Sequence, residues 1–134
     1  MVNWSESYNV DIIAIDNQHK ILFDIARDSA ALLNQNMDDK HDQILTVLTK
    51  LKNYTLFHFQ TEEKLMMQAN YSKLLSHKVL HDEFIESIEG ILHKLDIQQD
   101  DDVIREILVF LIDWLTNHIL KVDKYMAKEI TKSH

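Results

Sequence analysis

The stretch from Ile44 to Leu65, ILTVLTKLKNYTLFHFQTEEKL, decides the fold class, because it is long, periodic and free of glycine and proline. Seven of its positions are spaced alternately four and three residues apart, which places them on one face of a helix that packs against other helices at a shallow angle. These positions are Ile44, Leu48, Leu51, Thr55, His58, Glu62 and Leu65. The spacing predicts a helix over residues 41–68.

Comparable patterns occur in three other parts of the chain. They predict helices at about residues 16–36, 72–95 and 103–128, after an irregular N-terminal arm, with Asp16 as the N-cap of the first helix. The 134 residues include one glycine and no proline, so the turns that sheets and barrels need are scarce. Because the connections between the predicted helices are short, we expect a single all-α domain, residues 1–134, built as an up-down-up-down antiparallel four-helix bundle.

Charge and cysteine content exclude several classes of function. The chain has 22 acidic and 14 basic residues, a net charge of -8, which argues against a nucleic-acid partner. It has no cysteine, so a bound metal must be held by nitrogen and oxygen. Neither a secretory signal nor an apolar run of about 20 residues is present, and we therefore expect a cytoplasmic protein without a membrane partner.

Five histidines and a glutamate occupy positions where the packing pattern calls for apolar side chains. Each would cost about 1–3 kcal/mol if buried without a partner. In an antiparallel bundle the first turns of the first and third helices lie level with the last turns of the second and fourth, so all six fall in one layer. They are His19, His58, Glu62, His77, His81 and His118. A lone core histidine is more often hydrogen-bonded to a neighbour, but this set predicts a metal site.

Local spacing and ligand chemistry narrow the kind of site. His58 with Glu62, and His77 with His81, are pairs four residues apart that project from one helix face. Imidazole and carboxylate ligands suit iron, zinc, copper or nickel, and the mixed set without thiolate favours iron. Five imidazoles are too many for one ion that also binds a substrate, so we expect two ions bridged by carboxylates.

Asp123 is the candidate for a second bridging carboxylate besides Glu62. It follows His118 by five residues, which on a regular helix places the two about 140° apart. Spacing alone favours a solvated acid beside Lys121 and Lys124. We hypothesise that a local π-type widening of the helix turns Asp123 inward. Surface positions are expected for the remaining histidines, His41, His93 and His134.

Taken in order, His19, His58-x-x-x-Glu62, His77-x-x-x-His81 and His118-x-x-x-x-Asp123 resemble the ligand pattern of the hemerythrin family, especially its bacterial members. The resemblance covers almost the whole chain. It includes the blocks Trp4-Ser5-Glu6-Ser7-Tyr8, Ile15-Asp16-Asn17-Gln18-His19-Lys20, His58-Phe59-Gln60-Thr61-Glu62-Glu63 and Trp114-Leu115-Thr116-Asn117-His118-Ile119. Departures occur at Asp11, where members often carry glycine, and at Ser72 and Tyr125, none of which is a ligand position.

The resemblance implies a non-haem di-iron centre that binds one O2 reversibly, for storage, delivery or buffering of O2. Two iron ions per chain would be bridged by Glu62, Asp123 and an oxo or hydroxo group. One iron would have three histidine ligands, namely His77, His81 and His118. The other would have two, His19 and His58, and would keep an open position for O2. The resemblance also implies an O2 pocket lined by Phe59, Trp114, Leu115 and Ile119.

Two other functions remain open at this point. A di-iron enzyme that consumes O2 or NO, or a ferroxidase, is less well supported, because carboxylate-type di-iron proteins take glutamates from all four helices. A bundle that binds no metal and serves only to contact other proteins would leave the polar atoms of five core histidines without partners. No feature of the sequence indicates a protein partner.

Overall fold

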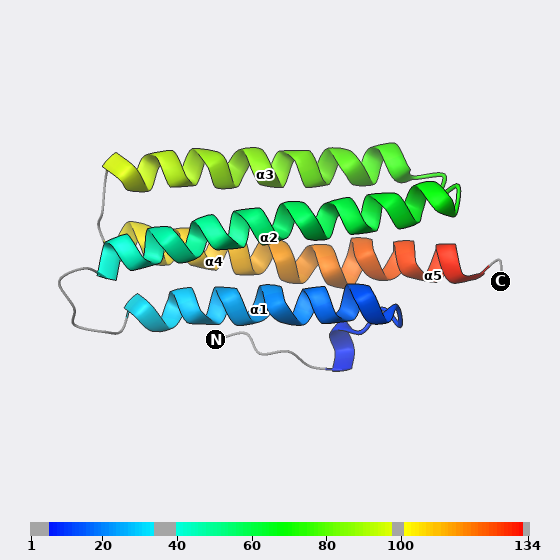
Figure 1. The fold of residues 1–134 in the computed structure, drawn as a ribbon, viewed down its shortest axis with the longest axis horizontal. Helices are drawn as coiled ribbons and strands as arrows, with labels where there is room; N and C mark the ends of the chain where they lie inside the picture. The colour runs from blue at the N-terminus through cyan, green and yellow to red at the C-terminus, as the bar shows by residue number, and fades with distance from the viewer. Residues whose placement is uncertain (1–5, 34–39, 98–100, 133–134) are drawn as a thin grey trace.

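The computed structural model describes residues 6–33, 40–97 and 101–132, and among them it contains helices and no strand. The elements are the 3-10 turn η1 (Glu6–Tyr8), α1 (Ile13–Leu33), α2 (Lys40–Gln68), α3 (Leu74–Ile97), α4 (Asp101–Asn117), the π-helical segment η2 (His118–Asp123) and α5 (Lys124–Lys132). Consecutive long helices run antiparallel (Figure 1). The predicted all-α, up-down-up-down four-helix bundle is confirmed.

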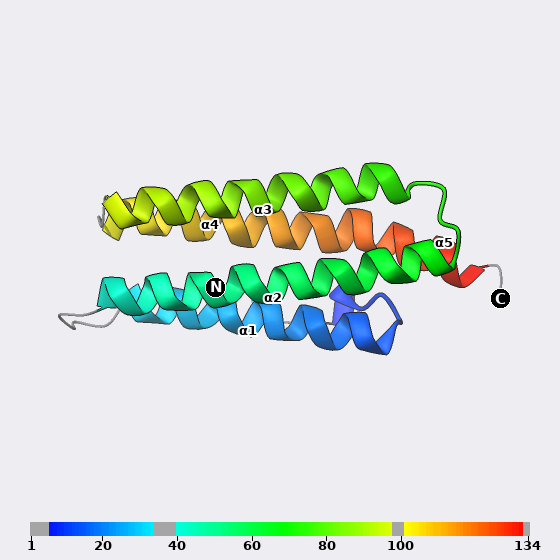
Figure 2. The same ribbon diagram turned by 45° about the horizontal axis from the view of Figure 1, so that its top comes forward.

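Four rods make up the bundle, because α4, η2 and α5 follow one another as one continuous rod (Figure 1). The α1 helix contacts α2 and α4, and α2 also contacts α3. The α3 and α4 helices meet through the stacked rings of Phe84 and Trp114, whose centroids are 3.9 Å apart. Figure 2 shows the rods side by side over most of their length, so each can contribute a side chain to the same layer. None of the described helices is long and apolar enough to span a membrane.

The apolar core is divided along the bundle. The larger part is formed by buried apolar side chains of α2, α3 and α4, together with Leu22 and Ile25 of α1. Two smaller clusters lie toward the opposite end, one of Val10, Ile15 and Ala127 and one of Met66, Met126 and Ile130. Buried polar side chains occupy the level between these clusters. Of the seven packing positions predicted between Ile44 and Leu65, all are buried except Leu65, which is half-buried.

The predicted start of the first helix was wrong by three residues. The α1 helix begins at Ile13, and Asp16 already donates its backbone N–H to the carbonyl of Ile12 at 2.9 Å. The Asp16 side chain instead accepts the N–H of Val10 at 2.8 Å and so ties the arm to the helix. The expectation that Asp16 is the N-cap fails because its carboxylate is used by this longer-range contact. The predicted end at residue 36 lies outside the described residues.

The other ends differ from prediction by a few residues at most. The α2 helix ends at Gln68 as predicted, and its last turn is closed by Asn70 in the left-handed conformation, with φ of 53°. The N–H groups of Tyr71 and Asn70 donate to the carbonyls of Met66 and Met67, which is the pairing of a Schellman motif. The α3 helix begins at Leu74 instead of residue 72, and the fourth rod extends to Lys132 instead of 128.

Candidate metal centre

The seven side chains predicted to bind metal lie together in the layer between the core clusters. Their exposed fractions are 5% or less, and they come from every rod of the bundle. The α1 helix supplies His19, α2 supplies His58 and Glu62, α3 supplies His77 and His81, and η2 supplies His118 and Asp123. The structure therefore brings all seven into one site. Their role as metal ligands remains a prediction.

The two carboxylates divide the histidines into two groups. Glu62 presents Oε1 to His81 Nε2 at 3.2 Å and to His77 Nε2 at 4.0 Å, and Oε2 to His58 Nε2 at 3.5 Å and to His19 Nε2 at 3.7 Å. One oxygen of the same carboxylate thus faces α3, and the other faces α1 and its own helix, α2. A carboxylate oriented in this way is placed to bridge two cations.

Asp123 repeats this division from the opposite rod. Its Oδ1 atom lies 3.1 Å from His77 Nε2 and 3.0 Å from His118 Nε2, while its Oδ2 atom lies 3.1 Å from His19 Nε2. The result is a three-histidine group and a two-histidine group that share Glu62 and Asp123. Within each group the potential ligand atoms lie within 4.8 Å of one another.

The π segment explains why Asp123 points inward. Residues 118–123 form a π-helix, and the N–H of Lys124 donates to the carbonyl of Ile119, five residues earlier. This widening brings positions five apart to one face, so that His118 and Asp123 are both buried. The hypothesised π-type widening is confirmed. The alternative of a solvated acid beside Lys121 and Lys124 is wrong, because the exposed fraction of Asp123 is 0%.

Eight buried nitrogen and oxygen atoms of the cluster have no hydrogen-bond partner among the described residues. Six of them face the interior of the cluster, including both oxygens of Glu62 and the Nε2 atoms of His19, His81 and His118. Several lie close to an opposite group but are not aligned as hydrogen bonds. Each such atom costs about 1–3 kcal/mol. Imidazole nitrogens and carboxylate oxygens that converge on one point fit metal ions, which would satisfy them together.

Burial keeps two of the imidazoles neutral. It lowers the pKa of His58 to about 3, and the neighbouring charge of His19 acts in the same direction. Burial likewise lowers the pKa of His81, with His118 and His77 adding to the effect. A neutral imidazole is the form that ligates a metal, so these side chains need no deprotonation at neutral pH.

The pKa values of His19, Glu62 and Asp123 are shifted by burial and by one another. Burial alone would lower the pKa of His19, but Asp123 and Glu62 raise it to about 9. Burial and the charge of Asp123 raise the pKa of Glu62 well above its ordinary value. Burial would also raise the pKa of Asp123, but the surrounding histidines, His118 first, hold it well below its ordinary value.

Residues 10–130 match the family of Hemerythrin HHE cation binding domains. The chain belongs to the hemerythrin family. It is 38% identical over 126 residues to a bacteriohemerythrin of Clostridium acetobutylicum, an alignment that covers 92% of this chain and 97% of the relative. It is 32% identical over 126 residues to a myohemerythrin of Sipunculus nudus, with 93% and 91% covered. A solved structure of wild-type hemerythrin superposes with a TM-score of 0.81 at 27% identity over 95% of each chain. Membership of the hemerythrin family and this cluster together support a non-haem iron protein.

Two residues that the sequence analysis did not single out hold histidines of this hemerythrin-family site in place. The Oε1 atom of Gln18 lies 2.7 Å from His58 Nδ1, and its Nε2 atom donates to the Thr61 hydroxyl at 3.2 Å. Glu63 Oε2 lies 2.9 Å from His81 Nδ1. Both acceptors favour the tautomer with the proton on Nδ1, which leaves the Nε2 lone pair facing the cluster. The sequence signals were that both residues stand within the blocks that resemble the family and that Gln18 precedes His19 and Glu63 follows Glu62.

The residues expected to line an O2 pocket are placed around the three-histidine group. Phe59 stacks on His81 with ring centroids 3.7 Å apart, and Trp114 stacks on His118 at 4.5 Å. Phe59, Leu115 and Ile119 are buried, and Trp114 is half-buried. These side chains form an apolar wall against the ligand rings. Their contact with O2 remains a prediction.

The other histidines lie away from the cluster in sequence, and their exposure differs. His93 is exposed, as expected. His41, at the start of α2, is half-buried, so the expectation of a fully surface position holds only in part. His134 lies outside the described residues.

Proposed function

We propose that this hemerythrin-family chain binds O2 reversibly at two non-haem iron ions, for storage, delivery or buffering of O2. The observation that carries the proposal is the division of the cluster, in which Glu62 and Asp123 each turn one oxygen toward the three-histidine group and the other toward the two-histidine group. One iron would be held by His77, His81 and His118, and the other by His19 and His58. Glu62, Asp123 and an oxo or hydroxo group would bridge them.

The inequality of the two groups supports binding of a small external ligand. The three-histidine group offers five protein ligand atoms and the two-histidine group offers four. With a shared solvent-derived bridge, the second ion has one protein ligand fewer, so this ion would keep the open position. A ferrous pair at this site would supply the two electrons that O2 takes up on binding and would recover them when O2 leaves.

The chain's own residues favour a carrier over an enzyme. The five imidazoles outnumber the two carboxylates, and an imidazole that ligates a metal is a neutral donor. Such a set leaves the ions more positively charged than a carboxylate-rich set does and tempers their oxidation. The apolar wall of Phe59, Trp114, Leu115 and Ile119 excludes water from the centre. Protection from water lengthens the life of the oxygenated form and limits loss of the bound oxygen as a reduced product.

The decisive experiment is anaerobic loading of the metal-free protein with Fe(II), followed by admission of O2 and then by purging. We expect uptake of two iron ions per chain and a charge-transfer absorption that appears with O2 and disappears on purging. Continuous O2 consumption or irreversible bleaching would instead support a di-iron oxidase or ferroxidase. Failure to take up iron would support a metal-free bundle.

A pair of histidine variants separates ligation from general effects of mutation. His58→Ala removes a buried ligand of the two-histidine group, whereas His93→Ala removes an exposed imidazole on α3. We expect the first variant to retain fewer than two iron ions per chain and to lose the O2-dependent absorption. The second should behave as wild type. Two retained irons in both variants would contradict the assignment of His58.

A further inference from the structure

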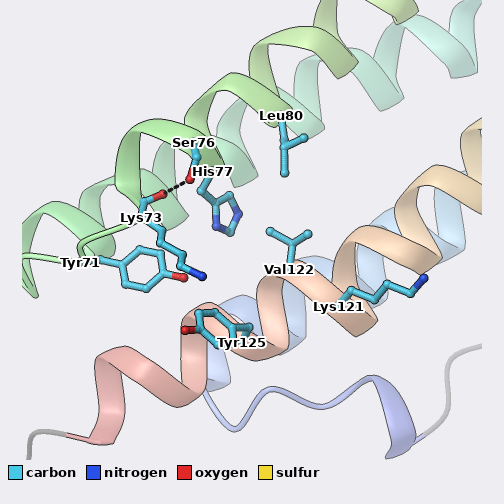
Figure 3. A pocket seen from close by; sticks show the side chains of 8 residues that line it. All are labelled: Tyr71, Lys73, Ser76, His77, Leu80, Lys121, Val122 and Tyr125. Atoms are coloured by element: carbon cyan, nitrogen blue, oxygen red, sulfur yellow. Dashed lines mark hydrogen bonds between the residues drawn. The ribbon is translucent and has the colours of Figure 1, made fainter.

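A pocket of about 360 Å³ lies beside the metal centre, between the start of α3 and the η2–α5 rod. It is lined chiefly by Tyr71, Lys73, His77, Leu80, Val122 and Tyr125. Figure 3 shows the His77 ring extending from α3 toward this pocket, with the ends of Lys73 and Tyr71 close to one another below it. The pocket therefore shares one wall, His77, with the candidate metal centre.

The polar side chains of this pocket donate hydrogen bonds or carry positive charge, and its lining contains no carboxylate. The ammonium group of Lys73 lies 4.4 Å from the ring centroid of Tyr125, and no described carboxylate lies within salt-bridge distance of it. The Ser76 hydroxyl is already used, because it donates to the Lys73 carbonyl at 3.1 Å. In a chain with a net charge of -8, this is an uncompensated cation at the mouth of a pocket.

A second, independent observation is the unpartnered Nδ1 atom of His77 in the inner wall of the pocket. The exposed fraction of His77 is 2%, and its Nδ1 atom has no hydrogen-bond partner among the described residues. Its Nε2 atom lies 3.1 Å from Asp123 Oδ1 inside the cluster. When Nε2 ligates a metal ion, as the proposed function requires, the proton is on Nδ1, on the side away from the cluster. His58 and His81 each have an acceptor for the equivalent N–H, namely Gln18 and Glu63, whereas His77 has none. A buried donor without an acceptor calls for a ligand that supplies one.

The helix end adds to the preference for an anion. The pocket lies at the N-terminus of α3, a helix of 24 residues with no acidic residue in its first turn. The partial positive charge at a helix N-terminus attracts anions. The remaining wall, formed by Leu80, Val122 and the two tyrosine rings, suits an apolar body.

We propose that this pocket binds a small organic carboxylate, whose oxygens accept hydrogen bonds from Lys73 and from His77 Nδ1 while its apolar part lies against Tyr71, Tyr125 and Val122. A second consequence rests on the proposed function. An anionic acceptor on Nδ1 makes His77 a stronger electron donor to its iron, which favours the ferric state. The bound carboxylate therefore accelerates autoxidation of the oxygenated protein.

Binding is tested on the iron-loaded diferric protein by calorimetric titration with benzoate, using benzamide as a neutral probe of the same shape. We expect saturable binding of one benzoate per chain and at least tenfold weaker binding of benzamide. Lys73→Met, which keeps the length of the side chain and removes its charge, should weaken benzoate binding roughly tenfold or more. Lys64→Met removes an equal charge from an exposed site on α2 and should leave the affinity unchanged.

Contact with His77 is tested in the same titration by NMR of the paramagnetically shifted imidazole N–H protons. We expect benzoate to shift one of these signals in wild type at the concentration at which heat is released. Binding that is equal in Lys73→Met and wild type would show that benzoate does not contact Lys73 and would overturn the proposal. Binding without any N–H shift would equally overturn it.

Iron content measured on the same sample keeps this test separate from that of the proposed function. If the protein holds two irons and carries O2 but does not bind benzoate, the proposed carboxylate pocket is contradicted and the proposed function is not. Protein that binds benzoate and loses this affinity in Lys73→Met supports the pocket even if its oxygen absorption is irreversible.

Discussion

Gln18 and His58 are joined by a hydrogen bond of 2.7 Å that crosses from α1 to α2. The bond holds a histidine of the two-histidine group from behind, and Gln18 is itself held by Thr61 at 3.2 Å. The ring of His58 is consequently fixed in both orientation and tautomer before a metal binds. Glu63 has the same relationship to His81 in the three-histidine group, but as an anion. The two sides of the cluster therefore differ in the charge of the acceptor behind a ligand as well as in the number of histidines.

Replacing Gln18 by leucine should weaken metal retention at the two-histidine group. The variant leaves the His58 Nδ1–H without an acceptor, and the loss of such a partner typically lowers metal affinity by about 10- to 100-fold. The measurement is iron content after dialysis against a graded series of chelator concentrations. Gln60→Leu changes an exposed glutamine on α2 and serves as the control. Equal iron retention by the two variants would show that the bond is not needed to hold the metal.

Replacing Glu63 by glutamine should slow autoxidation of the oxygenated protein. The amide still accepts a hydrogen bond from His81 but no longer carries a charge, so His81 donates less electron density and the ferric state is less favoured. The rate is followed by the decay of the oxygen-dependent absorption in air. Glu83→Gln, at an exposed position of α3, should decay as wild type does. A faster or unchanged rate in Glu63→Gln would contradict the inferred role of the charge.

The sequence was sufficient to predict the bundle and the level of the cluster. Helical periodicity sets the face on which a side chain lies, and antiparallel topology sets its height, so His19, His58 and His118 could be brought together without coordinates. Asp123 required a departure from the regular helix, and its position followed only from the hypothesis of a π segment. The seven residues converge as expected, while their occupation by iron remains a proposal.

What could not be predicted depends on side-chain directions and on contacts between distant segments. Gln18 and Glu63 are neighbours of cluster residues in sequence, but on a helix adjacent residues point in different directions. The acceptor that each histidine Nδ1–H meets depends on how α1 packs against α2 and how α2 packs against α3. The start of α1 at Ile13 was missed for a related reason, since Asp16 contacts Val10 across the preceding turn.

Replacing Asp123 by asparagine should reduce iron to one or fewer per chain. The side chain keeps its size, but a neutral amide offers a single oxygen ligand and cannot present an oxygen to both histidine groups. Iron is measured after gel filtration of protein loaded with excess Fe(II). Asp113→Asn, on the exposed face of α4, provides the matched control and should retain two. Two irons in Asp123→Asn would exclude the carboxylate as a required bridge.

Removing the metal should lower thermal stability substantially. The six buried polar atoms that face the interior of the cluster then lack partners, and a ligand that binds only the folded chain at a hundred times its dissociation constant adds about 2.7 kcal/mol to the free energy of unfolding. For a chain of this size that corresponds to a rise in Tm of roughly 10 °C. Melting is compared with and without iron in wild type and in His58→Ala. Equal shifts in the two proteins would mean that His58 does not contribute to metal binding.

Replacing Asp11 by glycine should leave stability unchanged or raise it by up to about 1 kcal/mol, whereas valine should lower it by more than that. Asp11 has a φ of 64°, in the left-handed region that glycine enters freely and that β-branched residues strongly resist. The residue is exposed, so packing contributes little to the difference between the variants. The free energy of unfolding is measured by denaturant titration of the metal-free protein, so that metal affinity does not enter. If valine were tolerated as well as glycine, the turn before α1 would have to be free to adopt an ordinary negative φ.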